Sequence, residues 1–187
     1  MKYLDKLLDS WKTVFTYDDI SILLGIENKN TIKSFINRLL KTWIVKSNFK
    51  WIYTLNKYEI FEFASKLKKD SYISFETVLK QNWIIFQDYS TTIFLASSNT
   101  ISKQVDNIYF KYNKIKDSIL YNPIWIINKW TYLIASPERA ICDRLYLSSN
   151  YYFDNLNNID KQKLIDISQI YNKRVILEVK KLLKNAK

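Results

Sequence analysis

The residues that could do chemistry in this chain are gathered in a basic stretch that contains no acid. Between Asn28 and Tyr58 there are seven lysine or arginine residues and no aspartate or glutamate. Such side chains neutralise phosphates, and arginine and asparagine can also pair with the edges of bases. The formal net charge of +11 likewise favours a polyanionic partner. The alternative is that these side chains are merely solvated, although a general enrichment in lysine does not explain a stretch without acids.

Other residue types that carry out chemistry are scarce. The chain has no histidine, which excludes a Ser-His-Asp or Cys-His nucleophile and removes the commonest metal ligand. Its one glycine, Gly25, cannot form a glycine-rich phosphate loop. Its one cysteine, Cys142, can form neither an internal disulfide nor a metal cluster. The sequence therefore predicts a protein that is not an enzyme and that has no metal site and no cofactor.

A winged helix-turn-helix is the arrangement that would place the basic stretch on DNA. The predicted elements are helices over residues 2–12, 17–24 and 31–41 and strands over 44–47 and 51–55. Thr16 and Asp19 have the spacing of a capping box for the second helix, Gly25 can end it, and Asn28 or Asn30 can cap the third. In this fold the third helix enters the major groove and the hairpin lies along the phosphate backbone.

The third helix carries most of the residues that would contact DNA. Its apolar residues, from Ile32 to Leu40, repeat at the spacing of a core-facing stripe, so its other face is polar. Asn37 and Arg38 could present paired groups to base edges, while the lysines could bind phosphates. The predicted ligand is double-stranded DNA. The predicted DNA-binding residues are Lys29, Asn30, Thr31, Lys33, Ser34, Asn37, Arg38, Lys41, Lys46, Asn48 and Lys50.

The remainder of the chain predicts a second domain of mixed helix and strand. A short linker helix over 58–67 ends at a run of lysines, so we expect a winged domain at 1–68 and an α+β domain at 69–187. A mainly antiparallel sheet and C-terminal helices are expected in the second domain. Its predicted strands are 84–86, 91–97, 108–112, 119–121, 124–127 and 132–135. Its predicted helices are 75–80, capped by Ser74, then 137–147, 160–171 and 173–184.

A charged cluster opens the helix that follows Ser136-Pro137, which is a strong helix start. It contains Glu138, Arg139 and Asp143. Because Arg139 and Asp143 are four residues apart, they can pair on one helix face. The cluster is then either a set of ion pairs that holds the helix to its sheet or an exposed functional surface. Catalysis is disfavoured, since neither a histidine nor a second acidic cluster accompanies it.

The glycines and tryptophans of the chain have unusual numbers and positions. At about 7% usage, about 13 glycines are expected, but the chain has one glycine and six tryptophans. Trp43 and Trp83 follow predicted helices at a position that favours glycine, and Trp130 falls in a predicted hairpin turn. We hypothesise that the gene uses UGA for glycine and was read with a code in which UGA is tryptophan. The residues concerned are Trp11, Trp43, Trp51, Trp83, Trp125 and Trp130. The alternative is that they are ordinary core and surface tryptophans.

Three short motifs resemble those of a known family. They are KWIY at 50–53, YISFE at 72–76 with Leu79, and ASPERAICD at 135–143, of which the last is the most specific. With them the chain resembles, over most of its length, the AbiEi family of antitoxins from type IV toxin–antitoxin systems. It departs from that family at Trp43, Trp51 and Trp83, where such proteins typically carry glycine.

The resemblance implies a transcriptional regulator whose N-terminal domain binds its own promoter and represses its own operon. It also implies that the C-terminal domain counteracts a nucleotidyltransferase-type toxin, without necessarily forming a stable complex with it. Glu138, Arg139 and Asp143 are the candidate antitoxin surface. Two other functions remain open: a winged helix that only docks another protein, and an accessory enzyme that acts on nucleic acid through its second domain.

The expected location is the cytoplasm. No apolar run approaches the roughly 20 residues that cross a bilayer, and the first residues lack the pattern of a signal peptide. A single cysteine is in keeping with a reducing compartment.

Overall fold

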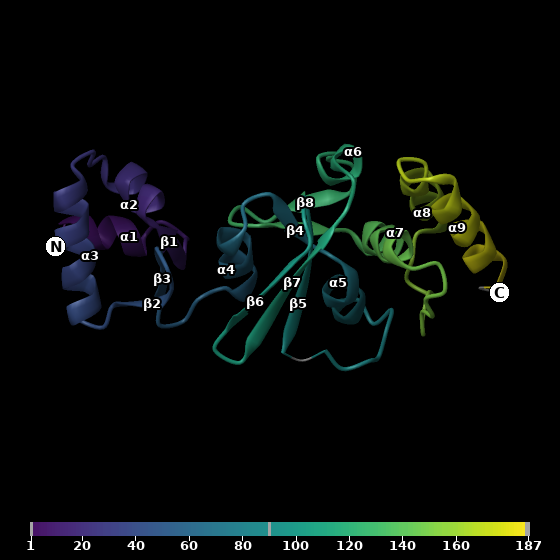
Figure 1. Ribbon diagram of the computed structural model, residues 1–187, viewed down its shortest axis with the longest axis horizontal. Helices are drawn as coiled ribbons and strands as arrows, with labels where there is room; N and C mark the ends of the chain where they lie inside the picture. Colours follow the sequence, from purple (N-terminus) through teal and green to yellow (C-terminus); the bar gives the residue numbers. More distant parts are fainter. Residues whose placement is uncertain (1, 90, 186–187) are drawn as a thin grey trace. The chain divides into compact units, whose positions relative to one another are not determined.

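The chain folds as two units of mixed helix and strand, Met1–Lys69 (unit 1) and Asp70–Lys187 (unit 2). A computed structural model describes residues 2–89 and 91–185, and Figure 1 shows the course of the chain through both units. Because each unit has helices and strands of its own, the α+β class predicted from the sequence is confirmed.

Unit 1 is built from helices around a small antiparallel sheet. Its elements are α1 (Lys2–Leu8), β1 (Val14–Thr16), α2 (Tyr17–Leu24), α3 (Lys29–Lys41), β2 (Val45–Phe49), β3 (Ile52–Leu55) and α4 (Ile60–Leu67). The strands are arranged in the order β1-β3-β2, and both pairings are antiparallel. The first strand was not predicted. It has only three residues, and its pairing partner lies almost forty residues further along the chain.

The core of unit 1 explains why α3 forms where it does. Ile32, Phe35, Ile36 and Leu39, which lie on one face of the helix, are all buried. They pack with Leu7, Phe15, Ile20, Leu24 and Val45 from the other elements. The predicted apolar stripe is therefore confirmed, and it fixes which face of α3 is left for solvent.

Local signals set the ends of α2 and α3. The capping box of Thr16 and Asp19 is present at the start of α2, and Gly25 ends that helix in a left-handed conformation with φ of 65°. The carboxamide oxygen of Asn28 accepts hydrogen bonds from the backbone N–H groups of Asn30 and Thr31, so Asn28 is the cap of α3. These contacts satisfy N–H groups that the first helical turn leaves without partners.

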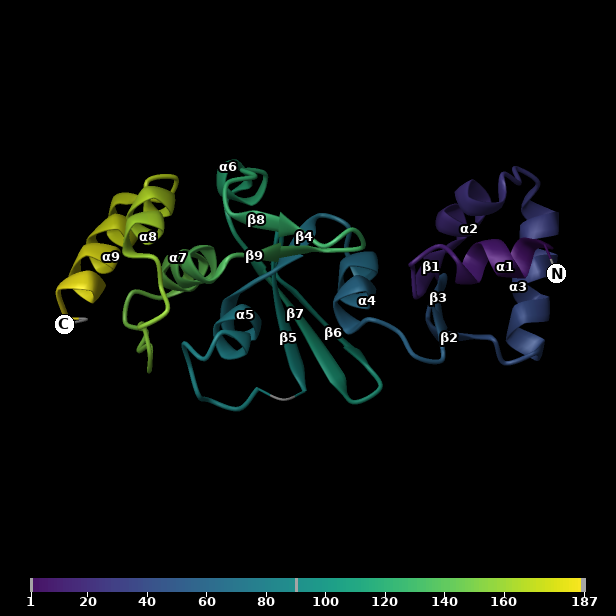
Figure 2. The ribbon, with the colours of Figure 1, turned by 180° about the vertical axis from the view of Figure 1, so that it is seen from behind.

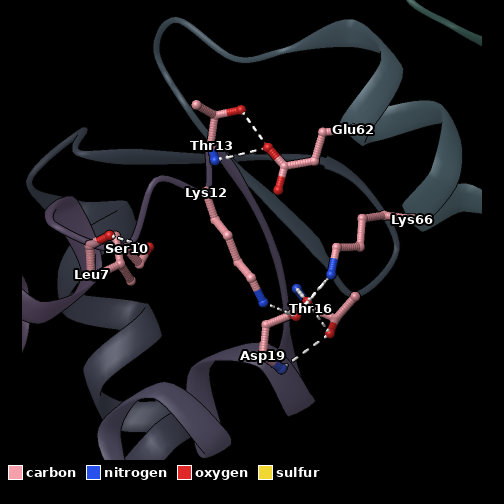
Figure 3. Close-up of polar contacts among 8 residues, drawn as sticks. All are labelled: Leu7, Ser10, Lys12, Thr13, Thr16, Asp19, Glu62 and Lys66. Carbon is pink, nitrogen blue, oxygen red and sulfur yellow. Dashed lines mark hydrogen bonds and ion pairs between the residues drawn. The ribbon is translucent and has the colours of Figure 1, made fainter. Parts of the chain in front are cut away.

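Helix α4, predicted as a short linker helix at the end of the first domain, is part of unit 1. Glu62 is 1% exposed, and its Oε2 accepts hydrogen bonds from the N–H and Oγ1 of Thr13, at 2.9 and 2.8 Å. Lys66 Nζ lies 2.7 Å from Asp19 Oδ2 at the start of α2 (Figure 3). The polar residues of α4 thus hold it against β1 and α2.

Unit 2 is organised around a six-stranded sheet. Its elements are β4 (Ser71–Ile73), α5 (Phe75–Gln81), β5 (Thr92–Ser97), β6 (Ile101–Val105), β7 (Ile108–Lys114), α6 (Asp117–Leu120), β8 (Ile126–Asn128), β9 (Leu133–Ala135), α7 (Pro137–Leu147), α8 (Lys161–Ser168) and α9 (Lys173–Asn185). The strand order is β6-β7-β5-β4-β9-β8. Helix α5 packs on β5 and α7, and α7 contacts α8 and α9 (Figure 2).

The expectation of a mainly antiparallel sheet in unit 2 is confirmed only in part, because the sheet is mixed. Three pairings are antiparallel, but β4 pairs with β9 and β5 pairs with β7 in parallel. The two central strands, β4 and β5, each have one antiparallel and one parallel neighbour. The sequence did not predict β4, which is short and fully buried, and without it the order of the strands could not be inferred.

Two predicted strands of unit 2 are not strands. Residues 84–86 are irregular; Ile84 and Ile85 are buried, and the carbonyl of Ile84 accepts from the N–H of Asp154 instead of from a neighbouring strand. Residues 119–120 belong to the short helix α6. Within the described ranges, 2–89 and 91–185, no helix has the length and apolar character needed to span a membrane.

Candidate nucleic-acid interface

The polar face of α3 is exposed along the whole helix. The stripe from Ile32 to Leu39 faces the core, and every predicted DNA-binding residue of α3 is therefore on the solvent side. The exposed residues are Lys29, Asn30, Thr31, Lys33, Ser34, Asn37, Arg38 and Lys41 on α3, Lys46 on β2 and Lys50 in the turn after β2. Only Asn48, among the residues predicted to bind DNA, is half-buried.

The basic side chains of this face carry no compensating acid. Among the residues that the structure describes, none of the cations on α3, β2 and the following turn forms an ion pair. The guanidinium of Arg38 lies 5.6 Å from the centre of the Phe35 ring. This contact holds the side chain along the helix without using up its hydrogen-bond donors. The positive charge of this face is thus open to an external anion.

A shallow hollow of about 430 Å³ lies beside α3. Asn30, Ser34 and Arg38 line it from one turn of α3 to the next, together with Tyr3 and Ile26. The ring of Tyr3 meets that of Phe35 edge to face, with 6.1 Å between their centres. The Tyr3 side chain is 41% exposed at this hollow. Its neighbours come from α3, so no signal near Tyr3 in the sequence could have shown this.

The hairpin of β2 and β3 presents Lys46 and Lys50. Its strands close through the pair Phe49 and Ile52, which leaves a two-residue turn that begins with Lys50. The register shifts between Ser47 and Phe49, so Asn48 lies in a bulge. Its Oδ1 accepts a hydrogen bond from the buried hydroxyl of Thr54 at 3.0 Å. Asn48 therefore holds the bulge in place, and the lysines are the side chains of the hairpin that are free to meet phosphate.

Helix α3 and the hairpin are brought together by the end of the helix. The backbone N–H of Ile44 donates to the carbonyl of Leu39 at 3.1 Å, and α3 packs on β2. The chain therefore turns directly from the basic helix into the basic hairpin. Both lie on one unit, with exposed cations on each.

The predicted antitoxin surface in unit 2 is corrected by burial. Arg139 and Asp143 are 0% exposed and Glu138 is 5% exposed. Since all three lie in the interior, they form no part of a surface. The Ser136-Pro137 helix start is confirmed, because the Ser136 hydroxyl accepts from the N–H of Arg139.

Arg139 and Asp143 also make no direct ion pair, although their spacing would allow one. The Tyr72 hydroxyl lies between them: it donates to Asp143 and accepts from Nε of Arg139 at 3.2 Å. The Ser74 and Tyr171 hydroxyls donate to Asp143, each at 2.6 Å. Ser74 is thus at the N-cap position of α5, as predicted, but its side chain bonds Asp143 and not the helix.

Arg139 completes this cluster with backbone acceptors. Its guanidinium donates to the carbonyls of Ile119, Asn122 and Ile124. Burial raises the pKa of Asp143, against the effect of the nearby Arg139 charge and of the hydroxyl donors. Burial also raises the pKa of Tyr72 and Tyr171, with Asp143 adding to the effect, so both hydroxyls keep the protons that they donate. The cluster joins α7 to β4, to α6 and the segment after it, and to the turn between α8 and α9.

Cys142, which follows Ile141 on α7 beside the cluster, is buried. Burial raises the pKa of the Cys142 thiol well above its usual value, so it stays protonated and is a poor nucleophile. In the part of the chain that the structure describes, no group of three or more acids and cysteines is placed to hold a metal ion.

Comparison of the chain with models of protein families and with curated proteins gives no match. The function is therefore inferred from the residues of the chain itself.

Proposed function

We propose that unit 1 is a winged helix-turn-helix that binds double-stranded DNA, and that the protein regulates transcription. The observation that carries this proposal is the exposed, acid-free face of α3, which continues into the two exposed lysines of the β2–β3 hairpin. The element order α1, β1, α2, α3, β2, β3, with a three-stranded antiparallel sheet, supports the winged fold.

The dimensions of α3 suit the major groove. Its 13 residues make a helix about 20 Å long, and a helix with its side chains is about 10–12 Å across, which matches the width of the major groove, about 12 Å. Asn37 and Arg38 are exposed in the C-terminal half of α3, where they could pair with base edges. Lys33, Lys41, Lys46 and Lys50 would then neutralise phosphates on either side.

Salt dependence tests the proposal. Four phosphate contacts predict that the logarithm of the affinity falls with the logarithm of the salt concentration at a slope of about −4, at about −0.9 per contact. The full chain would be titrated with a labelled duplex of its own promoter and with a scrambled duplex. Tighter binding to the promoter with such a slope supports the proposal. A slope near zero, or no binding in dilute buffer, overturns it and favours a protein-docking winged helix.

The second part of the proposal rests on the resemblance to the AbiEi family. We propose that the protein represses its own operon and that unit 2 counteracts a nucleotidyltransferase-type toxin. Because Glu138, Arg139 and Asp143 are interior, this role needs another surface of unit 2. The test is to express the neighbouring open reading frame with and without this protein. Growth arrest that the protein relieves supports the role, whereas a harmless neighbour or unrelieved arrest contradicts it.

A further inference from the structure

All six tryptophans of the chain have a left-handed backbone conformation. Their φ angles are 60° at Trp11, 57° at Trp43, 64° at Trp51, 57° at Trp83, 59° at Trp125 and 66° at Trp130. The single glycine, Gly25, has φ of 65°. We propose that the native residue at each of these six positions is glycine, encoded by UGA, and that tryptophan stands there because the gene was read with a code that assigns UGA to tryptophan.

Ordinary tryptophans would not be expected to have positive φ at all six positions. Only a few per cent of residues other than glycine have positive φ, and bulky ones are outliers. Six tryptophans would all fall there by chance less than about once in 10⁶ cases at that frequency. In the described part of the chain the other such residues are Phe75 and Asp106. Aspartate is among the residue types that tolerate this conformation.

Two of the tryptophans end helices in the same way as Gly25. At Gly25 the N–H donates to the carbonyl of Ile22, and the next N–H, of Ile26, donates to that of Ser21. Trp43 repeats this pattern after α3, donating to Leu40, with the N–H of Ile44 donating to Leu39. This pair of hydrogen bonds is the Schellman motif, in which the left-handed residue is usually glycine.

The end of α5 repeats the motif a third time. The N–H of Trp83 donates to the carbonyl of Lys80 at 3.1 Å, and that of Ile84 donates to Leu79 at 2.9 Å. The one glycine of the chain and two of its tryptophans therefore occupy equivalent positions in equivalent motifs.

Two other tryptophans lie in hairpin turns. Trp51 is the second residue of the two-residue turn between β2 and β3. Trp130 lies between β8 and β9, where its N–H donates to the side chain of Asn128 and the next residue, Thr131, donates to the carbonyl of Lys129. Positive φ in such turns is the ordinary place for glycine.

Most of the tryptophan side chains are exposed, and the ring contacts that the structure gives are those of Lys163 with Trp125, at 4.4 Å, and of Lys50 with Trp51, at 6.0 Å. Tryptophan is highly buried on average, yet Trp11 is 93% exposed and Trp130 is 97% exposed. Trp43, Trp51 and Trp83 are also exposed, and Trp125 is half-buried. By contrast, Phe75 is fully buried, so its packing can hold its unusual backbone. Of the alternative, ordinary core and surface tryptophans, exposure excludes the core part at five of the six positions, and the left-handed backbone is the argument against ordinary surface tryptophans.

The codons and the mass of the native protein test the proposal directly. We expect UGA at all six positions of the gene. We also expect the protein from the source cell to have a mass below that calculated from the sequence. The expected difference is six times the mass difference between a tryptophan and a glycine residue. UGG at most of the positions, or a native mass that matches six tryptophans, overturns the proposal whatever the protein binds.

Stability gives a second test that does not depend on the source cell. Three recoded genes would give proteins with tryptophan, alanine or glycine at all six positions. Relief of left-handed strain is expected to raise Tm by about 2–4 °C per site in a chain of this size, hence by more than about 10 °C for the glycine protein. Alanine removes the indole but keeps Cβ, so the alanine protein should melt clearly below the glycine protein. Equal melting of these two would overturn the conformational argument.

A matched control tests whether glycine is stabilising only at the positions with positive φ. Ile22 is 82% exposed but lies within α2 and does not have positive φ. Ile22→Gly is expected to lower Tm, since glycine is a poor helix former. A rise in Tm with Ile22→Gly would mean that removal of an exposed apolar side chain, and not backbone strain, explains the gain at the tryptophans.

Discussion

The charged residues of the two units differ in what surrounds them. On α3 the cations are exposed, and none of those in the described structure has a carboxylate partner. At the start of α7 the charges are buried, and Arg139 and Asp143 each have several hydrogen-bond partners within unit 2. A buried charge is tolerated only when hydrogen bonds or an opposite charge compensate for the water that it has lost. An exposed cation is hydrated and needs no partner in the protein.

This difference separates residues that hold the fold from residues that can bind. In the sequence, both groups are charged residues on a helix. The structure shows that the charged residues at the start of α7 make their contacts within unit 2. The exposed cations of α3 are therefore the candidate interface. The comparison predicts that changes at α7 alter stability and not DNA affinity, and that changes at α3 do the reverse.

The largest expected effect is at Asp143. Asp143→Ala removes the common acceptor of Tyr72, Ser74 and Tyr171 and leaves Arg139 buried without the nearby charge. Breaking a buried charged network in this way costs about 3–5 kcal/mol, measured as the free energy of unfolding of unit 2 in denaturant. Asp143→Asn, which keeps an acceptor, should lose less. Unaltered stability in both variants, or a selective loss of DNA binding by folded protein, would break the comparison.

Arg38 should have the next largest effect, on DNA affinity alone. Arg38→Ala is expected to weaken promoter binding about tenfold to a hundredfold and to reduce the preference over a scrambled duplex. Arg38→Lys is the control, since it keeps the charge but loses the paired donors. Fluorescence anisotropy at fixed salt measures both. If the lysine variant keeps the full preference for the promoter sequence, the prediction that Arg38 makes paired hydrogen bonds to a base edge is wrong.

The lysines of the hairpin should act through charge only. Lys46→Ala and Lys50→Ala are each expected to weaken binding severalfold to all duplexes alike and to reduce the salt slope by about 1. Lys180→Ala removes the same charge from an exposed site on α9 of unit 2 and serves as the control. An equal loss in all three variants would show that net charge, and not the face formed by α3 and the hairpin, governs affinity.

Much of this arrangement could be predicted because it depends on residues that are close in the sequence. The stripe from Ile32 to Leu39 predicts α3 and its exposed face, and the caps at Thr16, Asn28 and Ser136 mark where helices begin. The features that the sequence failed to predict depend on contacts between residues that are far apart in the chain. The spacing of Arg139 and Asp143 shows that they share a helix face, but not that Tyr72, more than sixty residues away, covers it. Strand β4, which carries Tyr72, was missed for the same reason.

The smallest expected effect concerns two acids inside unit 1, away from the acid-free stretch of the sequence. Burial opposes the ionisation of Asp19, but hydrogen bonds from Lys66, Thr16 and Lys12 outweigh it and hold its pKa well below the usual value (Figure 3). Burial raises the pKa of Glu62, although hydrogen bonds from Thr13 oppose the rise. In the described structure its second oxygen, Oε1, is buried without a hydrogen-bond partner.

These two shifts have opposite consequences in acid. The stabilisation from Asp19 is present above the pKa that it has in the unfolded chain, about 4, and is lost as the pH falls toward the lower folded value. The contribution of Glu62 is fully present below its unfolded pKa and is lost as the pH rises through the higher folded value. Acidification therefore weakens unit 1 through Asp19 and partly restores it through Glu62.

Asp19→Asn should accordingly reduce the loss of unfolding free energy between about pH 7 and about pH 3 by about 1 kcal/mol, while Glu62→Gln should increase that loss. Asp18→Asn, at an exposed acid next to Asp19, is the control and should leave the profile unchanged. Denaturant unfolding of unit 1 at the two pH values measures all three. If Asp19→Asn and Glu62→Gln shift the profile in the same direction, then the two carboxyl groups do not differ in the way that their partners in unit 1 imply. Buried charges would then be a poor guide to what holds either unit together.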